Sequence, residues 1–283
     1  MWKRERWNKL IQMKLSKREQ KGLESMKTIT IANLKGGVGK TVTTINLSYL
    51  LAEEHGKRIL IVDNDQQGNT SQFFGRYDYD HKGMSDILRK MATAEEAIQK
   101  TEHPNIDIIS ANLSLADAER AVQIDSTIPQ QIRLKTALEG VQDRYDYAII
   151  DNAPSLGMCV INAMTASDYL LIPAKIDKWT FDGIDLLIEQ MEAVQGYFNR
   201  GLELLGTLIT SYRRNDSNQQ GAEWMRQAEK FKAFDTRIRW TDKIDESTFT
   251  NDPIVIHSPR CGAAKDYRAF AEEFLACVGG AEA

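Results

Sequence analysis

The chain has 283 residues, a length that can bury a sizeable core in one large domain. Its 36 basic and 40 acidic residues give a formal net charge of -4, so the charge of the whole chain does not indicate a nucleic-acid partner. No run approaches the roughly 18 apolar residues that a membrane-spanning helix needs. The three cysteines form no C-x-x-C pair, which argues against a disulfide framework and a standard zinc site and favours a reducing, cytoplasmic setting.

The N-terminal segment differs in character from the rest of the chain. Residues 1–27 contain nine basic and three acidic side chains, a local net charge of +6, and no apolar stretch of the kind found in secretion signals. Apolar residues recur there at near-helical spacing. The segment is therefore either a short basic amphipathic helix that could contact DNA or an anionic membrane, or a disordered extension. We assign residues 1–26 as a basic extension and residues 27–283 as a single domain.

Beyond this segment, strand and helix patterns alternate. The predicted strands are short apolar runs without polar alternation, at 28–33, 58–63, 106–111, 147–151, 169–174 and 204–210. The predicted helices lie at 41–55, 113–122, 128–142, 157–166, 180–198, 217–231 and 263–277. This β-α-β succession predicts an α/β fold, a doubly wound and mostly parallel sheet flanked by helices.

The sequence NLKGGVGKTVTT, residues 33–44, connects the first predicted strand to the first predicted helix. A glycine-rich turn at this place lets backbone N–H groups and the helix N-terminus converge on a phosphate, as in a P-loop. Gly36, Gly37 and Gly39 free the backbone for that purpose. The general spacing G-x-x-x-x-G-K-[ST] would place a glycine at position 34, where this chain has Leu34, so the motif is a variant.

Two residues at the start of the helix have a direct role in this chemistry. Lys40 can neutralise the β- and γ-phosphates of a nucleotide, and the hydroxyl of Thr41 can bind Mg²⁺. A second lysine, Lys35, lies five residues earlier, and its side chain need not point at the same nucleotide as Lys40.

Three strings together resemble the ParA/Soj branch of the MinD/ParA ATPases, which have a deviant Walker A motif. They are KGGVGKT at 35–41, RILIVDNDQQGNTSQFFG at 58–75 and YDYAIIDNAPSLGMCVINAM at 145–164. In that family the first lysine of the motif reaches across a nucleotide-sandwich dimer to the phosphates bound by the other subunit. The resemblance implies this role for Lys35, a homodimer formed on ATP binding, and ATP and Mg²⁺ as cofactors. The nucleotide-binding residues that we predict are Lys35, Gly36, Gly37, Val38, Gly39, Lys40, Thr41 and Val42.

Carboxylates follow two of the predicted strands, where the ends of parallel strands face the ligand crevice. Asp63 and Asp65 come at the end of the second strand, and Asp151 ends the strand at 147–151. The resemblance implies that Asp151 orients Mg²⁺ at the Walker B position, that Asp65 positions the attacking water, and that Asp63 supports the metal shell. We predict Lys35, Lys40 and Asp65 as catalytic residues and Thr41, Asp63 and Asp151 as the metal site.

The chain departs from the family pattern at three places near this site. Gln66 occupies a position where proline is common, and Val42 replaces a threonine whose hydroxyl often reaches the α-phosphate. The residues after Asp151 read Asn-Ala-Pro, without the usual pair of prolines. None of these changes removes a charged catalytic group, so they bear on affinity and rate more than on the reaction.

The resemblance also implies a function in DNA segregation. Under this hypothesis the ATP-bound dimer binds DNA without sequence preference and associates with the nucleoid. A ParB-like adaptor stimulates it to move a plasmid, chromosome or mobile element. Residues 212–243 contain eight basic and five acidic side chains, although much of this charge could simply solvate helix faces. By register with the family we expect Lys243 and Arg260 to contact DNA, while Gly262 replaces an arginine found in relatives.

Other functions within the same superfamily are alternatives to the DNA-segregation hypothesis. A MinD-like membrane-cycling ATPase needs a basic amphipathic C-terminal helix, whereas this chain ends in AFAEEFLACVGGAEA, so a membrane is not predicted as a partner. A cluster-carrying reductase needs paired cysteines, and Cys159 has no neighbouring cysteine. The sequence leaves open an ATPase that positions another cellular machine without contacting DNA. The 26 residues before the first strand are too few for a helix-turn-helix domain, so operator recognition is not predicted.

Overall fold

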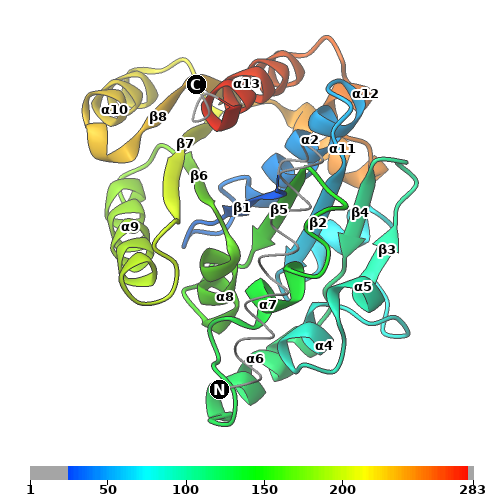
Figure 1. Ribbon diagram of the computed structural model, residues 1–283. Coiled ribbons are helices and arrows are strands. Elements are labelled where there is room, and N and C mark those ends of the chain that lie inside the picture. Colours follow the sequence, from blue (N-terminus) through cyan, green and yellow to red (C-terminus); the bar gives the residue numbers. More distant parts are fainter. Residues whose placement is uncertain (1–24, 280–283) are drawn as a thin grey trace.

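An eight-stranded β-sheet forms the centre of the computed structural model, which describes residues 25–279. The strands are β1 (Lys27–Ile31), β2 (Ile59–Asn64), β3 (Ile98–Lys100), β4 (Ile106–Ile109), β5 (Tyr147–Asn152), β6 (Tyr169–Lys175), β7 (Glu203–Tyr212) and β8 (Ala233–Arg239). Their order is β3-β4-β2-β5-β1-β6-β7-β8, and every neighbouring pair is parallel except β3 with β4. The predicted fold class, a mostly parallel doubly wound sheet, is confirmed (Figure 1).

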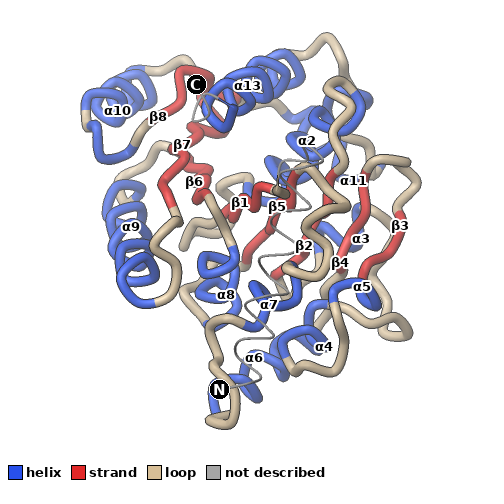
Figure 2. Tube along the Cα trace, viewed as in Figure 1, coloured by secondary structure: helices blue, strands red, loops and turns tan. Residues whose placement is uncertain are grey.

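Helices cover both faces of this sheet (Figure 2). They are α2 (Lys40–Glu53), α3 (Asn69–Phe73), α4 (Met84–Leu88), α5 (Ala94–Ala97), α6 (Ser114–Ile124), α7 (Arg133–Leu138), α8 (Met158–Ala166), α9 (Thr180–Tyr197), α10 (Asp216–Gln227), the 3₁₀ helix η1 (Glu229–Phe231), α11 (Asp242–Thr250), α12 (Ile254–His257) and α13 (Gly262–Gly279). Among residues 25–279, no helix is both long and apolar enough to cross a membrane.

Strand β2 shows why the sheet carries continuous apolar runs. Ile59 and Ile61 are fully buried in one hydrophobic cluster, together with residues of α2, α12 and α13. Leu60 and Val62 are equally buried on the other face, in a cluster with residues of α4, α6 and α7. Because successive side chains point to opposite faces of a strand, a sheet covered on both faces needs apolar residues at every position.

Two elements at the edges of the sheet were not predicted. The predicted helix 217–231 ends as α10 at Gln227, and β8 follows it after η1. In β8 only Phe234 and Ile238 are deeply buried, and three polar residues separate them, so a search for continuous apolar runs misses this strand. The short antiparallel β3 was missed for the same reason, since none of its three residues is fully buried.

The predicted helix 128–142 is also shorter than expected. Its helical part, α7, begins at Arg133, where the side-chain Oδ1 of Asn162 accepts hydrogen bonds from the backbone N–H groups of Arg133 (2.9 Å) and Leu134 (3.3 Å). An acceptor that satisfies free N–H groups at the first turn fixes the start of a helix. Here the cap comes from α8, a tertiary contact that the local sequence does not reveal.

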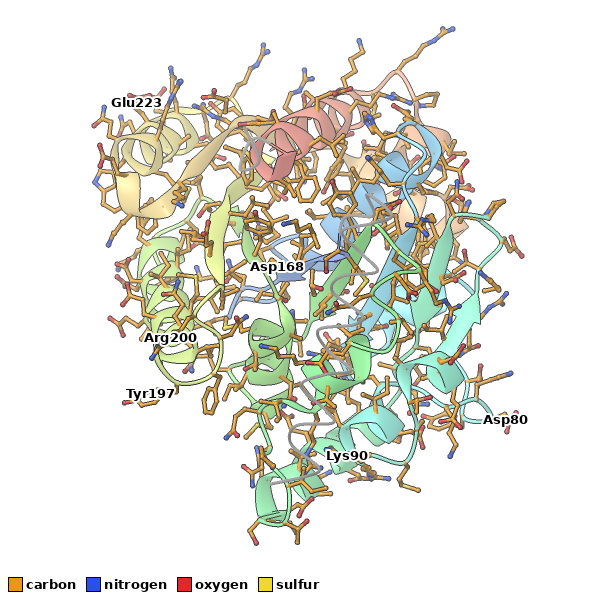
Figure 3. All side chains as sticks on the ribbon, viewed as in Figure 1. Asp80, Lys90, Asp168, Tyr197, Arg200 and Glu223 are labelled. Atoms are coloured by element: carbon orange, nitrogen blue, oxygen red, sulfur yellow. The ribbon has the colours of Figure 1, made fainter. Side chains whose placement is uncertain are left out.

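The N-terminal end of β1, opposite the end that leads into the P-loop, is anchored by hydrogen bonds. Asp168, labelled in Figure 3, accepts a hydrogen bond from the backbone N–H of Thr28 (2.7 Å) and donates its own N–H to the Thr28 carbonyl (2.8 Å). Met26 is buried and donates its N–H to Gln142. Apart from Ser25 and Met26, the predicted basic extension lies outside the described residues, and its role stays a prediction.

Candidate nucleotide-binding site

The P-loop lies between the end of β1 and the start of α2. Gly37 and Gly39 have φ angles of +70° and +85°, a left-handed backbone that side chains rarely adopt. A Cβ atom added to Gly36 or Gly37 would meet nothing within 4 Å, so space is open beside the loop backbone. The hydroxyl of Thr210 in β7 donates to the Val38 carbonyl (2.8 Å) and fixes the loop to the sheet. The free N–H groups at the start of α2 therefore face a site that an anion can approach.

Lys40 lies within this loop and is almost completely buried. Its Nζ donates a hydrogen bond to the Lys35 carbonyl at 3.0 Å. Burial lowers the pKa of Lys40, and the carboxylates of Asp151 and Asp65 oppose that shift. A buried ammonium beside two carboxylates is placed to neutralise phosphate oxygens in the loop.

Lys35 points to a different partner. Its Nζ forms an ion pair with Oδ1 of Asp177, just beyond β6, and lies 5.7 Å from the centre of the Trp179 ring. Its backbone N–H donates to Oδ1 of Asn33 at 3.0 Å. The two lysines of the loop thus occupy distinct environments, Lys40 inside the loop and Lys35 at the surface.

Asp151 is the point where three elements meet. Its Oδ2 accepts hydrogen bonds from the hydroxyls of Thr41 in α2 and Thr70 in α3, both at 2.7 Å. Its Oδ1 is buried and has no hydrogen-bond partner among residues 25–279. Burial raises the pKa of Asp151 to about 6. An unpartnered carboxylate oxygen beside a threonine hydroxyl is a donor set suited to Mg²⁺, which prefers oxygen ligands.

The described residues contain no group of three or more His, Cys, Asp or Glu side chains that could hold a metal ion by themselves. A magnesium ion at Thr41 and Asp151 would therefore need further oxygens from nucleotide phosphates and water. This is how Mg²⁺ usually binds in phosphate-transfer sites, with one or two carboxylates and several waters. The residues present fit that arrangement.

Asp63 is the register partner of Asp151 on the adjacent strand β2, and it is fully buried. Its Oδ2 accepts hydrogen bonds from the N–H (2.8 Å) and the hydroxyl (2.7 Å) of Ser71, and its Oδ1 accepts one from the Asp65 N–H (3.2 Å). Burial and the neighbouring Asp151 raise the pKa of Asp63 to about 8. Both oxygens of Asp63 are thus engaged within the protein, in contrast to those of Asp151.

Asp65 begins the turn that follows β2 and is half-buried. Its Oδ1 accepts a hydrogen bond from the N–H of Gln67 at 2.9 Å, and its carbonyl accepts one from Gly68 at 2.9 Å. At Gly68 φ is +63°, and an added Cβ would lie 2.5 Å from the Tyr77 ring and 2.6 Å from the Ala111 carbonyl. Glycine is therefore required at this position, and it closes the turn that orients Asp65.

Sequence reasoning missed Thr70, Ser71 and the buried asparagines of this edge. Asn152 donates to the Thr30 hydroxyl (2.8 Å) and the Ile31 carbonyl (3.0 Å), and its Oδ1 accepts from Asn64 (2.7 Å). A polar residue at the end of an otherwise apolar strand was the available indication for both asparagines. Thr70 and Ser71 directly follow Gly68 and Asn69, but nothing in their spacing shows that they contact Asp151 and Asp63.

The last three predicted site residues are Val42, Lys243 and Arg260. Val42 packs against the hydrophobic cluster under α2, so the position that often supplies a hydroxyl is apolar here. Lys243, at the start of α11, pairs with Glu246, whose oxygens lie 2.8 and 2.9 Å from its Nζ. Arg260 is exposed between α12 and α13, and its guanidinium forms no hydrogen bond or ion pair with other described residues. Lys243 and Arg260 thus lie away from the P-loop in sequence and on separate elements.

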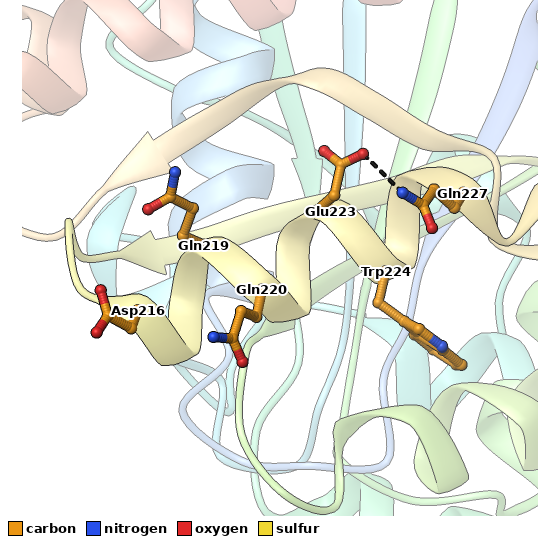
Figure 4. A pocket seen from close by; sticks show the side chains of 6 residues that line it. All are labelled: Asp216, Gln219, Gln220, Glu223, Trp224 and Gln227. Carbon is orange, nitrogen blue, oxygen red and sulfur yellow. Dashed lines mark hydrogen bonds between the residues drawn. The ribbon is translucent and has the colours of Figure 1, made fainter.

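A surface hollow of about 460 Å³ lies along α10 (Figure 4). It is lined by Asp216, Gln219, Gln220, Glu223, Trp224 and Gln227. All six residues come from one helix, and Glu223 and Gln227 are hydrogen-bonded to each other at 2.9 Å. No P-loop residue lines the hollow, so the nucleotide site is identified by its backbone and carboxylates.

The fold and the loop together define a P-loop nucleotide-binding protein of the deviant Walker A type. Residues 26–204 match the family model described as an AAA domain. Soj of Bacillus subtilis, a sporulation initiation inhibitor protein, is 38% identical over 252 residues, which span 88% of this chain and 98% of Soj. The chromosome partitioning protein ParA of Caulobacter vibrioides is 34% identical over 254 residues, or 88% of this chain and 94% of ParA.

A solved structure shares the fold of this chain. Cobyrinic acid a,c-diamide synthase from Mycobacterium smegmatis, with a bound ATP analog and magnesium, matches with a TM-score of 0.77 at 26% identity. The match covers 91% of this chain and 97% of the synthase. The chain belongs to the ParA/Soj family of partition ATPases, as the motifs predict.

The raised pKa of Asp63 predicts how stability changes with pH in the nucleotide-free protein. An unfolded carboxyl titrates near 3.8, so between that value and about 8 the folded state binds more protons than the unfolded state. The free energy of unfolding should therefore fall as pH rises through this window, by at most about 1.4 kcal/mol per pH unit. Asp63→Asn should flatten the decline, and the exposed Asp80→Asn should not. Urea unfolding at about pH 6 and pH 8 measures this, and equal slopes in all three proteins would contradict it.

Proposed function

We propose that the protein is a magnesium-dependent ATPase that dimerises on ATP and segregates DNA. In this proposal the ATP-bound dimer is cytoplasmic and nucleoid-associated, binds DNA without sequence preference, and hydrolyses ATP when a ParB-like adaptor stimulates it. Family membership and the partitioning function in the name of the Caulobacter relative support segregation. The bound ATP analog and magnesium of the solved synthase support the choice of cofactors.

The residues of the site divide the work of phosphoryl transfer between them. The P-loop N–H groups and Lys40 would bind the phosphates, and Thr41 and Asp151 would hold Mg²⁺, which would supply positive charge beside the phosphates. Asp65, in its turn fixed by Gly68, orients the water that attacks the γ-phosphate. Asp63 keeps this turn in place through the Asp65 N–H and the first turn of α3.

One observation carries the dimerisation part of the proposal, namely the separate environments of the two lysines. Lys40 is buried in the loop and bonded to its backbone, whereas Lys35 is directed to the surface, where its side chain is 26% exposed. In a single subunit, the ammonium group of Lys35 therefore does not contact its own P-loop. Two triphosphates brought together repel each other, and a cation contributed from each subunit to the other's nucleotide would offset that repulsion.

Substituting each lysine separately tests this division of roles. Lys40→Ala should abolish nucleotide binding, because the phosphates lose their only buried cation in the loop. Lys35→Ala should retain most nucleotide binding but lose ATP-dependent dimerisation and turnover. Fluorescent-nucleotide titration and sedimentation velocity separate the two effects. Unchanged dimerisation of Lys35→Ala in saturating Mg-ATP would refute the cross-subunit role.

The role of Asp65 is tested by its removal. Asp65→Ala should bind ATP and dimerise but hydrolyse ATP at least about 100-fold more slowly, as expected when a group that orients or accepts a proton from the attacking water is lost. The matched control is Asp80→Ala, an exposed aspartate in another loop. Phosphate release is the measurement. Full turnover by Asp65→Ala would remove this residue from the mechanism.

The proposed DNA surface lies among basic residues that are only partly neutralised within the protein. Of the basic side chains in residues 212–243, four form ion pairs, Arg226–Asp235, Lys230–Asp185, Arg239–Asp266 and Lys243–Glu246. Arg213 instead stacks on Trp240 at 4.1 Å, and Arg260 remains unpaired among the described residues. Phosphates attract free guanidinium groups without regard to sequence, which supports the assignment of Arg260 more strongly than that of Lys243.

DNA retention tests this surface and separates it from the membrane-cycling alternative. Arg260→Ala should weaken ATP-dependent retention on DNA and reduce the slope of log K against log salt by about one unit, and Lys243→Ala should do the same to a smaller extent. Arg120→Ala, which removes an exposed arginine of α6, is the control. Unchanged slopes would exclude these contacts. ATP-dependent pelleting with anionic vesicles, without DNA retention, would favour the MinD-like alternative.

A further inference from the structure

The backbone around Lys35 is fixed from several sides. Its N–H donates to Oδ1 of Asn33, and the Nδ2 of Asn33 donates to the Pro173 carbonyl in β6 at 2.8 Å. The Lys35 carbonyl accepts the hydrogen bond from Nζ of Lys40. Any change of partner by Lys35 must therefore be made by its side chain, because the peptide groups on both sides are held.

The side chain is held as well, by the segment that follows β6. Oδ1 of Asp177 pairs with Nζ of Lys35, and the Trp179 ring lies against the same ammonium group. Trp179 is 63% exposed and Asp177 is 39% exposed, so the contact is at the surface and accessible to another molecule. Contact with the face of an indole ring adds to the attraction of the carboxylate.

Asp177 is prearranged for this contact. Its Oδ1 also accepts hydrogen bonds from the Trp179 N–H (2.9 Å) and the Thr180 hydroxyl (3.1 Å), and its own N–H donates to the Thr180 hydroxyl (3.1 Å). These bonds form the turn that leads from β6 into α9. The carboxylate is therefore oriented whether or not Lys35 is paired with it, and the lysine has a fixed place to return to.

We propose that Asp177 is a positioning residue, which retains the Lys35 ammonium inside its own subunit until a second nucleotide-bound copy offers a stronger anion. This inference rests on the proposed cross-subunit role of Lys35. A single carboxylate competes poorly with a triphosphate, whose terminal group carries about two negative charges, so the exchange favours the dimer when ATP is present. With ADP the competing charge is smaller, and Lys35 stays with Asp177. The ion pair between Lys35 and Asp177 thereby adds a free-energy cost to dimerisation, a threshold that ATP overcomes and ADP does not.

The size of this threshold follows from the exposure of the pair. An ion pair that is partly exposed to solvent is weak, so releasing one lysine should cost about three-fold in affinity, which is about 0.65 kcal/mol. Both subunits must release their lysine when the dimer forms, so the two factors multiply to about ten-fold in the dimer dissociation constant.

Charge removal at Asp177 tests the inference. Asp177→Asn keeps an oxygen to accept the Trp179 N–H and so preserves the start of α9, but it removes the charge that holds Lys35. With Mg²⁺ and the non-hydrolysable analogue AMPPNP, the full-length variant should dimerise about ten-fold more tightly than the unchanged protein, and it should form some dimer with ADP. Glu189→Gln removes one carboxylate from the exposed face of α9 and should leave both values unchanged. Asp177→Glu keeps the negative charge, so its dimer dissociation constant should be close to that of the unchanged protein. Sedimentation velocity over a concentration series gives the constants, and thermal melting confirms folding.

The outcomes separate this inference from the proposed function. If Lys35→Ala abolishes dimerisation while Asp177→Asn dimerises like the unchanged protein or more weakly, the restraint is refuted and the cross-subunit lysine stands. If the unchanged protein forms no dimer with Mg-AMPPNP, the proposed switch fails and this inference fails with it. Tighter dimerisation of Asp177→Asn that survives in the double variant with Lys35→Ala would also refute it, because the effect would then not pass through the lysine.

Discussion

The hydrogen bonds at Asp151 are the constraint on which the rest of the site depends. This carboxylate belongs to the penultimate residue of β5, and one of its oxygens joins Thr41 at the start of α2 to Thr70 at the start of α3. Burying a charge is unfavourable unless hydrogen bonds compensate for the lost water. Among the described residues, only one oxygen of Asp151 has such hydrogen bonds. The protein alone thus leaves the site incomplete, and a cation held at the free oxygen would complete it.

The neighbouring strand increases that demand. Asp63 lies beside Asp151 in register and is buried as deeply, and the charge of Asp151 adds to the burial that raises the pKa of Asp63. Two like charges in a low-dielectric interior raise each other's pKa, and a divalent cation relieves the repulsion. The parallel register of β2 and β5 therefore places two buried carboxylates, Asp63 and Asp151, side by side near the P-loop.

Sequence patterns predicted the parts of the structure that depend on local composition. The glycine loop, the apolar strands and the carboxylates at their ends are dictated by backbone freedom, burial on two faces and strand direction, and each was placed within a few residues of its element. The edge strand β8 and the start of α7 were missed because one-sided burial and the cap from Asn162 are settled by tertiary packing. Asp177 lies 142 residues from Lys35, and no spacing rule connects them.

The tight packing at Gly68 links the site to the surface around Tyr77 and Tyr79. The turn that holds Asp65 touches the Tyr77 ring and the Ala111 carbonyl, leaving no room even for a methyl group. Dense interiors do not deform continuously, so this turn can shift only if its neighbours shift with it. If nucleotide hydrolysis moves this turn, the Tyr77 ring must move with it. The exposed ring of Tyr79, which contacts Tyr77 edge to face, would then change position at the surface.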